Sequence, residues 1–445
     1  MSSIVVVGGG IAGLACAWRL RHAGHDVEVL EAGGSAGSPL RSELIDGYRL
    51  EHGPAAFGAL DSNHRDLVST LGLEDSLVPI QPGGDAILRG GTCVPIEIDR
   101  LRSLAGLPLL SPTAKFRSAR LLADLVRRRA EFDLHHPERL APSERVDAAT
   151  SLAALVGVEA RDFLLGPIVE ARLGTPLEDC SDAFARLSLF AGFGAAPATA
   201  LLGGMGRIAE ALSAQVPIRS RTRVVAVETE ESGAVLRYRT MTSAGEEREG
   251  RVFADGVVVA VPPSIAGEMC LKLTPDERGF LSATPSQRAI VVHLLLDEVP
   301  RERSFYTLHI PACLGLDVVR VQVEHLKRDA APPGAALLRV ELAPRSLDRL
   351  WRMDDEKLGV RTLEAIQRTP FGRLRPRRML VHRSEHAFSR FGPGSLGRLN
   401  AFAKRTDRTP RLAFAGDHCV GPYTEGALTS GMRAANEIVR DVAGN

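Results

Sequence analysis

The chain lacks several features that would mark large classes of protein. No apolar run approaches the roughly 20 residues that a membrane-spanning helix requires. Its six cysteines show no Cys-x-x-Cys spacing, so neither a disulfide framework nor a metal site is indicated. The 55 Lys and Arg residues balance 54 Asp and Glu residues, which gives no argument for nucleic acid as a partner. No basic leader precedes the strand-like run at residues 4–7, and we expect a cytoplasmic protein without a signal peptide.

A glycine-rich turn joins an apolar strand to a helix near the start of the chain. The strand at residues 4–7 runs into Gly8-x-Gly10-x-x-Gly13, and helical spacing follows over residues 14–22. In such a turn Gly8 permits the tight bend, Gly10 admits a pyrophosphate close to the backbone, and Gly13 lets helix and strand pack closely. The helix N-terminus supplies N–H donors and a partial positive charge. The motif therefore predicts a dinucleotide-binding site.

An acidic residue ends the second strand of this unit. Glu31 follows an apolar strand at residues 27–30 and lies 18 residues after Gly13. A carboxylate at this position accepts hydrogen bonds from a ribose 2′-hydroxyl and repels a 2′-phosphate, which argues against NADP. By itself, this first unit leaves NAD and FAD open.

The C-terminal segment combines a carboxylate with a helix N-terminus. The run "RLAFAG" leads to Asp417, and we expect Thr424 to cap a helix over residues 425–442. FAD is long enough for Asp417 to accept a hydrogen bond from its ribityl chain while the N–H groups of Gly426 and Ala427 face the flavin pyrimidine edge. Negative charge gathers at that edge in reduced flavin, and such donors stabilise it. NAD has no ribityl chain, so the two ends together favour FAD.

The middle of the chain predicts a division into two domains. We expect an FAD-binding domain assembled from residues 1–94, 189–262 and 376–445, and a substrate-binding domain made of residues 95–188 and 263–375. The first insertion is helical and rich in arginine, whereas the second is mostly strand-forming. The basic helices could make weak peripheral contact with a membrane, or they could present an ordinary solvated face.

Segments along the whole chain share motifs with one known superfamily. They are "VVVGGGIAGLACAWRL", "GSPLRSE", "EHGPAAF", "LLGGMGRIAEAL", "ADGVVVAVPPS" and "FAGDHCVGPYTEGALTSGMRAANEI". On these segments the chain resembles the flavin-containing amine oxidase and protoporphyrinogen oxidase superfamily. The resemblance implies an α/β fold of the Rossmann type, the two-dinucleotide-binding-domain FAD fold, with a mixed-sheet and helical substrate domain.

The resemblance also implies a set of cofactor contacts. Arg41 and Ser42 match a segment that runs along the pyrophosphate and flavin, and Val224 matches a position that meets adenine through its backbone. No cysteine stands in the segment "HAFSRFGPGS" before the tail, so we expect non-covalent FAD. The predicted FAD-binding residues are Gly8, Gly10, Ile11, Ala12, Gly13, Glu31, Ala32, Arg41, Ser42, Gly53, Pro54, Val224, Gly416, Asp417, Glu425, Gly426 and Ala427.

The chain departs from the amine oxidases at positions that would contact substrate. Many amine oxidases carry a lysine on the strand that corresponds to residues 289–296, but this strand has none, and Arg288 is the nearest cation. Tyr423 matches one wall of their paired-aromatic cage, and Phe391 is the best candidate for the other wall. We predict Tyr423 as the catalytic-site side chain, and His52, Arg288 and Phe391 as weaker substrate candidates.

These features predict a two-electron dehydrogenation by hydride transfer to flavin N5. The expected substrate is a hydrophobic, specialised metabolite that is oxidised at a C–N or C–C bond. A second GxGxxG for nicotinamide is missing, so the expected acceptor is O2, giving hydrogen peroxide, with a quinone less favoured. Protoporphyrinogen or coproporphyrinogen oxidation, carotenoid-type desaturation and FAD-dependent isomerisation without net redox remain alternatives. The oligomeric state is left open.

Overall fold

A five-stranded parallel sheet brings the two ends of the chain together. A computed structural model describes residues 1–58, 62–96, 104, 106–192, 198–242, 245–302 and 304–443. The strand order is β19-β13-β1-β2-β9, and every neighbouring pair is parallel. The strands are β1 (Ser3–Val7), β2 (Asp26–Leu30), β9 (Ile218–Arg219), β13 (Gly256–Val259) and β19 (Leu412–Phe414). Strands β13 and β19 are buried along their whole length, as parallel strands covered on both faces should be.

Two helices, the first and the last of the chain, pack against each other beside this sheet. They are α1 (Ile11–His22) and α15 (Thr424–Ala443). Their axes approach closely because both helices present small residues at the contact. A Cβ added to Gly431 of α15 would lie 2.1 Å from the carbonyl oxygen of Ala12.

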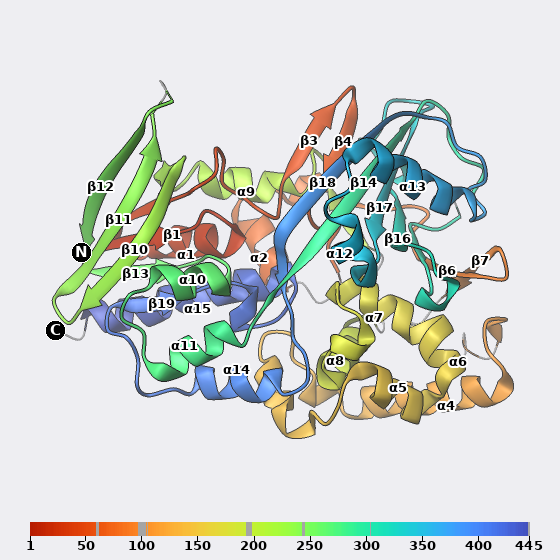
Figure 1. Ribbon diagram of the computed structural model, residues 1–445, viewed down its shortest axis with the longest axis horizontal. Helices are drawn as coiled ribbons and strands as arrows, with labels where there is room; N and C mark the ends of the chain where they lie inside the picture. The colour runs from red at the N-terminus through yellow and green to blue at the C-terminus, as the bar shows by residue number, and fades with distance from the viewer. Residues whose placement is uncertain are drawn as a thin grey trace.

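A second, seven-stranded sheet lies beyond the parallel sheet (Figure 1). Its order is β18-β14-β17-β16-β15-β6-β7. The strands are β6 (Asp85–Arg89), β7 (Thr92–Ile96), β14 (Ser286–Leu296), β15 (Thr307–His309), β16 (Val318–Val323), β17 (Ala336–Leu342) and β18 (Pro376–Ser389). Alternate residues of β14 point to opposite faces, so Val292 packs in a cluster with Leu358 and Ile366, whereas Leu295 packs with Tyr48 and Leu50. The second of these clusters joins the two-stranded hairpin that contains Tyr48 and Leu50 to the seven-stranded sheet.

A layer of helices lies under one end of the seven-stranded sheet and a three-stranded meander stands at the opposite end of the molecule (Figure 1). The helices are α4 (Pro112–Arg127), α5 (Ala148–Val156), α6 (Val158–Ala160), α7 (Gly166–Leu173) and α8 (Asp182–Gly192), with a π-helical turn at Arg161–Leu165. Ser111 caps α4 and Asp147 caps α5 through their side chains. The meander consists of β10 (Thr222–Glu230), β11 (Gly233–Met241) and β12 (Glu247–Ala254).

The remaining elements connect these layers. They are β3 (Ser42–Ile45), β4 (Tyr48–Glu51), α2 (Ser62–Thr70), β5 (Leu77–Pro79), β8 (Thr199–Leu201), α9 (Gly206–Ser213), α10 (Pro263–Met269), α11 (Pro275–Ser282), α12 (Leu347–Leu350), α13 (Asp355–Gln367) and α14 (Ser395–Ala403). None of the described helices combines the length and the apolar character needed to cross a bilayer.

Sheet membership differs from the predicted domain division at two boundaries. Strands β6 and β7 begin within residues 1–94, and β18 lies within residues 376–445, yet all three belong to the seven-stranded sheet. The helical insertion predicted over residues 95–188 contains α4 to α7 and most of α8. Chain order alone could not assign β18, because a strand after a long insertion can pair with either sheet.

Candidate functional site

The glycine turn after β1 has the geometry that its motif predicts. Gly8 has a φ of +103°, and a Cβ added to it would lie 2.4 Å from the Ala260 carbonyl oxygen. A Cβ on Gly13 would lie 2.0 Å from the Gly8 carbonyl oxygen, so helix and strand are in direct contact there. Helix α1 begins after Gly10, and no side chain caps it. The first turn of α1 therefore presents backbone N–H groups without a competing side-chain acceptor.

The carboxylate of Glu31 is held beside this turn. Its two oxygens accept hydrogen bonds from the backbone N–H groups of Gly9 and Gly33, each at 2.6 Å. Ala32, also a predicted contact, lies between Glu31 and Gly33, just after β2 ends at Leu30. The carboxylate therefore stands where a ribose bound along the glycine turn would meet it.

Asp417 lies at the same edge of the sheet, because β19 runs parallel to β13 and ends at Phe414. Its carboxylate accepts hydrogen bonds from the N–H and the hydroxyl of Ser389, at 2.6 and 2.7 Å. Burial raises the pKa of Asp417, although both hydrogen bonds from Ser389 oppose the rise. Ser389 is the last residue of β18, and the sequence analysis did not identify it.

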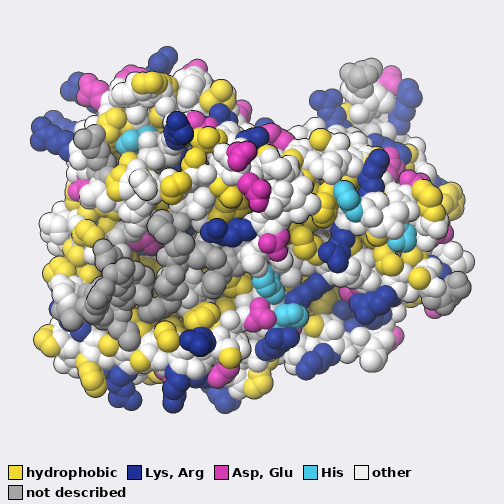
Figure 2. Space-filling view, turned by 180° about the vertical axis from the view of Figure 1, so that it is seen from behind, with side chains coloured by type: hydrophobic (Ala, Val, Ile, Leu, Met, Phe, Trp, Pro, Cys, Tyr) yellow, Lys and Arg dark blue, Asp and Glu magenta, His cyan; other side chains and the backbone are white. Residues whose placement is uncertain are grey.

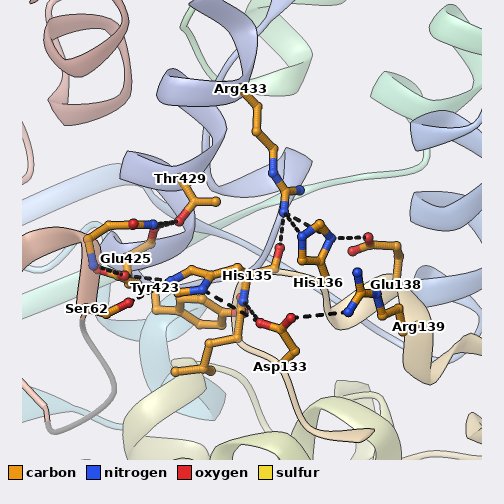
Figure 3. A network of polar contacts seen from close by, with 12 residues as sticks. Ser62, Asp133, His135, His136, Glu138, Arg139, Tyr423, Glu425, Thr429 and Arg433 are labelled. Carbon is orange, nitrogen blue, oxygen red and sulfur yellow. Dashed lines mark hydrogen bonds and ion pairs between the residues drawn. The ribbon is translucent and has the colours of Figure 1, made fainter. Parts of the chain in front are cut away.

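Glu425, in the first turn of α15, is the centre of a buried polar network (Figure 3). Its carboxylate accepts hydrogen bonds from the N–H groups of Asn63 and His64 at 2.6 and 3.1 Å. The ring nitrogens His64 Nδ1 and His135 Nε2 lie 2.6 and 2.8 Å from its oxygens. Burial alone would raise the pKa of Glu425, but the bonds from His135 and His64 outweigh burial and lower the pKa to about 2. Protein groups occupy the carboxylate of Glu425. A cofactor could therefore contact the backbone of this residue rather than its side chain.

Tyr423 and Arg433 fasten the same loop of the helical insertion to α15 (Figure 3). The Tyr423 hydroxyl donates to the Leu134 carbonyl oxygen at 2.7 Å. The guanidinium of Arg433 donates to the His135 carbonyl oxygen at 2.5 Å and lies 3.2 Å from the ring of His136. Burial raises the pKa of the Tyr423 hydroxyl well above its ordinary value. This hydroxyl therefore anchors the loop in its neutral form, which differs from the predicted role of a group facing substrate.

His52 belongs to a histidine cluster between β4 and the seven-stranded sheet. Its Nε2 lies 3.0 Å from a carboxylate oxygen of Glu43, and its ring centroid lies 4.4 Å from His382 and 6.4 Å from His293. Burial lowers the pKa of His52 and lowers that of His382 to about 4. Each ring is therefore neutral near pH 7.

The loop after β4 is held by a buried arginine. Arg339 donates to the carbonyl oxygens of Glu51 and Gly53, at 3.2 and 2.9 Å. A Cβ on Gly53 would lie 2.1 Å from the carbonyl oxygen of Pro39, so Gly53 and the following Pro54 are packed directly on the segment that precedes Arg41. The structure thus joins two segments that the resemblance associates with flavin.

Three other predicted cofactor residues have defined structural surroundings. The Ser42 hydroxyl donates to Glu51 at 2.7 Å and accepts from the Gly206 N–H at 2.8 Å, so it is engaged within the protein. The side chain of Arg41 is exposed. Val224 is buried, and the pairing of β10 with β11 shifts register immediately after it, which frees part of the strand backbone there.

Two of the predicted substrate contacts, Arg288 and Phe391, interact with other protein side chains. Arg288 pairs with Glu385 at 3.4 Å and lies 4.8 Å from the ring of Trp351, at the partly exposed start of β14. Phe391 is only 4% exposed and packs on Phe184 at 4.6 Å between ring centroids. Phe391 therefore belongs to the apolar core, in a cluster against which Tyr423 also packs, and its role as a second wall of an aromatic cage stays a prediction.

Sequence reasoning missed the partners of these site residues. His64, His135 and Ser389 belong to no quoted motif, Arg433 lies in the C-terminal motif without an assigned role, and each of the four contacts a residue that is 28 to 361 positions away in the chain. The doublet His135-His136 is the one signal that could have drawn attention to the loop.

The fold and the site together define a flavin-dependent oxidoreductase, and comparison with known proteins agrees. The profile described as flavin containing amine oxidoreductase matches residues 11–439. The chain belongs to this family, and the predicted superfamily and the predicted FAD-type α/β fold are confirmed.

Individual relatives carry two kinds of name. The coproporphyrinogen III oxidase of Staphylococcus aureus is 26% identical over 40% of this chain, and that match spans only 38% of the relative. The coproporphyrinogen III oxidase of Mycobacterium bovis is 26% identical over 98% of this chain and 97% of its own length. A solved structure of a putrescine oxidase triple mutant has a TM-score of 0.79 at 20% identity, covering 98% of each chain, and shows likeness of fold alone.

Proposed function

We propose that this chain is an FAD-dependent enzyme that removes two electrons from a C–N or C–C bond of a hydrophobic substrate. The electrons leave the substrate as a hydride that the flavin accepts, and O2 is the final acceptor. One observation carries the proposal: the uncapped start of α1, the carboxylates of Glu31 and Asp417, and the start of α15 meet at one edge of the parallel sheet. The carboxyl edge of such a sheet is where extended nucleotide ligands bind.

The residues at this edge fit FAD in order along its length. The N–H groups at the start of α1 would hold the pyrophosphate, and Glu31 would accept from the ribose. Asp417 retains lone pairs for a ribityl hydroxyl beside those that Ser389 occupies. A Cβ on Gly426 would lie 2.6 Å from the Gly421 carbonyl oxygen, so the start of α15 packs directly on the loop before it and admits no side chain there. Bound FAD supplies the two-electron acceptor, which the side chains lack.

Attachment of the cofactor is proposed to be non-covalent. Cys419 is the cysteine nearest in sequence to Asp417, and burial raises the pKa of its thiol, which keeps it protonated and a weak nucleophile. The flavin should therefore leave with the solvent when the protein is denatured and filtered, and flavin retained on the denatured chain would contradict this part of the proposal.

The substrate is proposed to differ from a simple primary amine. Strand β14 carries no lysine, the Tyr423 hydroxyl is engaged with the helical insertion, and Phe391 is buried in the core. These are the positions at which the resemblance predicts amine recognition. A larger hydrophobic amine or alkaloid-like compound fits this pattern better.

A porphyrinogen is the second candidate substrate. The observation in its favour is the similarity over 98% of the chain to a protein named coproporphyrinogen III oxidase. Porphyrinogen oxidation to a porphyrin removes six electrons in three two-electron dehydrogenation steps, and each step demands the same cofactor position.

An anaerobic reduction experiment separates these candidates. The purified yellow protein is mixed without oxygen with coproporphyrinogen, with protoporphyrinogen, and with a panel of secondary amines, and the flavin absorbance is followed; free FAD with each compound is the control. Bleaching by a porphyrinogen favours the second candidate, and bleaching by an amine the first. Readmitted air should restore the colour with release of hydrogen peroxide. A colourless protein that takes up no FAD would overturn the whole proposal.

A further inference from the structure

Large apolar side chains are exposed on one part of the helical insertion. Phe116 and Val126 of α4 are 64% and 44% exposed, and Leu155 of α5 and Val158 of α6 are 46% and 56% exposed. These side chains bury little apolar area on folding, so they contribute little hydrophobic stabilisation to the chain alone. A group of such side chains on one surface is typical of a site that a partner covers.

These side chains share one surface with arginines. Helix α4 packs beside both α5 and α6. The guanidinium of Arg117 lies 3.3 Å from where a Cβ would stand on Gly157, between Leu155 and Val158. We define the α4–α6 surface as the exposed residues Phe116, Arg117, Arg120, Ala123, Val126, Arg127, Leu155 and Val158.

Helix α4 is amphipathic, and its outer face carries apolar side chains and arginines together with one acid, Asp124, which is paired with Arg127. Its inner face buries Leu121, Leu122 and Leu125 in the core. On the outer face, apolar residues and arginines recur together from one turn to the next, from Phe116 to Arg127. A helix that carries arginines and exposed apolar groups on one face is typical of binding in the plane of a membrane interface.

Of the three arginines on this surface, Arg127 is paired with Asp124, whereas the charges of Arg117 and Arg120 are not neutralised by described residues. Arg117 and Arg120 form no ion pair with any residue in the described part of the chain. Two carboxylates of the same helices are already paired, Asp124 with Arg127 and Glu159 with Arg89. The surface therefore offers free positive charge to an anionic partner.

A groove with the same chemistry adjoins the surface. It has a volume of about 650 Å³ and is lined by Leu155 together with Arg128, Arg139 and Arg145. Its two carboxylates are both paired, Glu131 with Arg128 at 2.5 Å and Asp182 with Arg186 at 3.2 Å. Cationic walls with an apolar rim suit a phosphate-bearing headgroup whose chain continues along the apolar surface.

We propose that the α4–α6 surface docks on an anionic lipid surface. Figure 2 shows apolar and Lys or Arg side chains together along the lower margin of the molecule, where the helical layer of Figure 1 lies. The apolar side chains enter the headgroup region while the arginines extend to lipid phosphates. A lipid surface fits better than a protein partner because the apolar side chains stand out from helix faces instead of lining an apolar pocket. A hydrophobic substrate that partitions into lipid would reach the enzyme from the same side.

Co-flotation with lipid vesicles tests the proposal on the holoenzyme. One set of vesicles is pure phosphatidylcholine, and in the other set part of it is replaced by phosphatidylglycerol. The wild-type chain should bind the anionic set, and added salt should weaken binding. Each arginine near such a surface contributes about fivefold, so the double variant Arg117→Glu, Arg120→Glu should bind at least about 25-fold more weakly. The variant Phe116→Ser should weaken binding as well.

Matched variants elsewhere on the molecule provide the controls. Arg237 and Arg251 are exposed and paired opposite each other in the meander, and Phe253 is 71% exposed. Arg237→Glu with Arg251→Glu, and separately Phe253→Ser, should leave vesicle binding unchanged. The flavin absorbance of every variant reports whether it has folded.

Three results would overturn the proposal. The first is no binding of the wild-type chain to anionic vesicles, and the second is equal loss of binding in the meander variants. The third is a wild-type dimer that Phe116→Ser converts to a monomer, which would assign the surface to a second copy of this chain. All three are independent of which substrate the enzyme oxidises.

Discussion

Replacing Glu425 with glutamine removes charge from a buried carboxylate while keeping its size. In the native chain this group accepts hydrogen bonds from the start of α2 and from the rings of His64 and His135. The pKa of Glu425 is lowered from 4.5 to about 2. At about 1.4 kcal/mol for each unit of pKa, this preference for the ionised form corresponds to about 3 kcal/mol. We expect Glu425→Gln to lower the free energy of unfolding by about 3 kcal/mol near pH 7, because it leaves buried donors facing an amide.

The same contacts determine the sign of a pH dependence. Folding lowers the pKa of Glu425, so its contribution is complete above about pH 5 and is lost as the pH falls toward 2. Hydrogen bonding to Glu425 raises the pKa of His135 above 6.5, so that contribution is present at lower pH and is lost as the pH rises through the raised value. Glu425→Gln should flatten the stability profile on both sides.

Urea unfolding followed by circular dichroism measures both effects, from about pH 2 to about pH 8, a range that covers the titration of both groups. Hydrogen exchange at residues 133–136 adds a local reading, since this loop should open more often in the variant. The control is Asp276→Asn, an exposed acid in the first turn of α11 that interacts mainly with the helix dipole and should cost about 0.5 kcal/mol. Equal losses of about 0.5 kcal/mol in the two variants would show that Glu425 also acts only on its helix, and the network argument would be refuted.

Three further changes test other contacts. Gly431→Ala places a Cβ 2.1 Å from the Ala12 carbonyl oxygen, so it should separate α1 from α15 and reduce the flavin content of the purified protein; a normal content would contradict this. Ser389→Ala removes the hydroxyl that donates a hydrogen bond to Asp417 and that opposes the rise of the Asp417 pKa on burial. FAD should therefore bind about tenfold more weakly in a titration, the effect of one hydrogen bond to a charged group. Ser389→Thr keeps the hydroxyl and should restore the affinity. Tyr423→Phe removes one hydrogen bond and should cost about 1 kcal/mol of stability; a large fall in kcat with unchanged stability would instead return this hydroxyl to the chemistry.

The sequence alone determined the parts of this protein that follow local rules. The glycine turn could be predicted because Gly8 takes a positive φ that favours glycine and Gly13 lies against the nearby Gly8 carbonyl oxygen, both within one local motif. The position of Asp417 followed from the strand before it, since apolar parallel strands align their carboxyl ends at one edge. The family and the flavin chemistry rested on these same segments.

Only the tertiary structure decided how the site is held together. Glu425 reads as an ordinary acid in a helix first turn, yet its partners His64 and His135 lie 361 and 290 positions away. Phe391 reads as a cage residue, but a core ring at Phe184 buries it. Local patterns specify backbone turns and strand ends, whereas the direction of a side chain depends on which insertion packs over it. That packing involves contacts between distant segments, and no spacing within either segment encodes them.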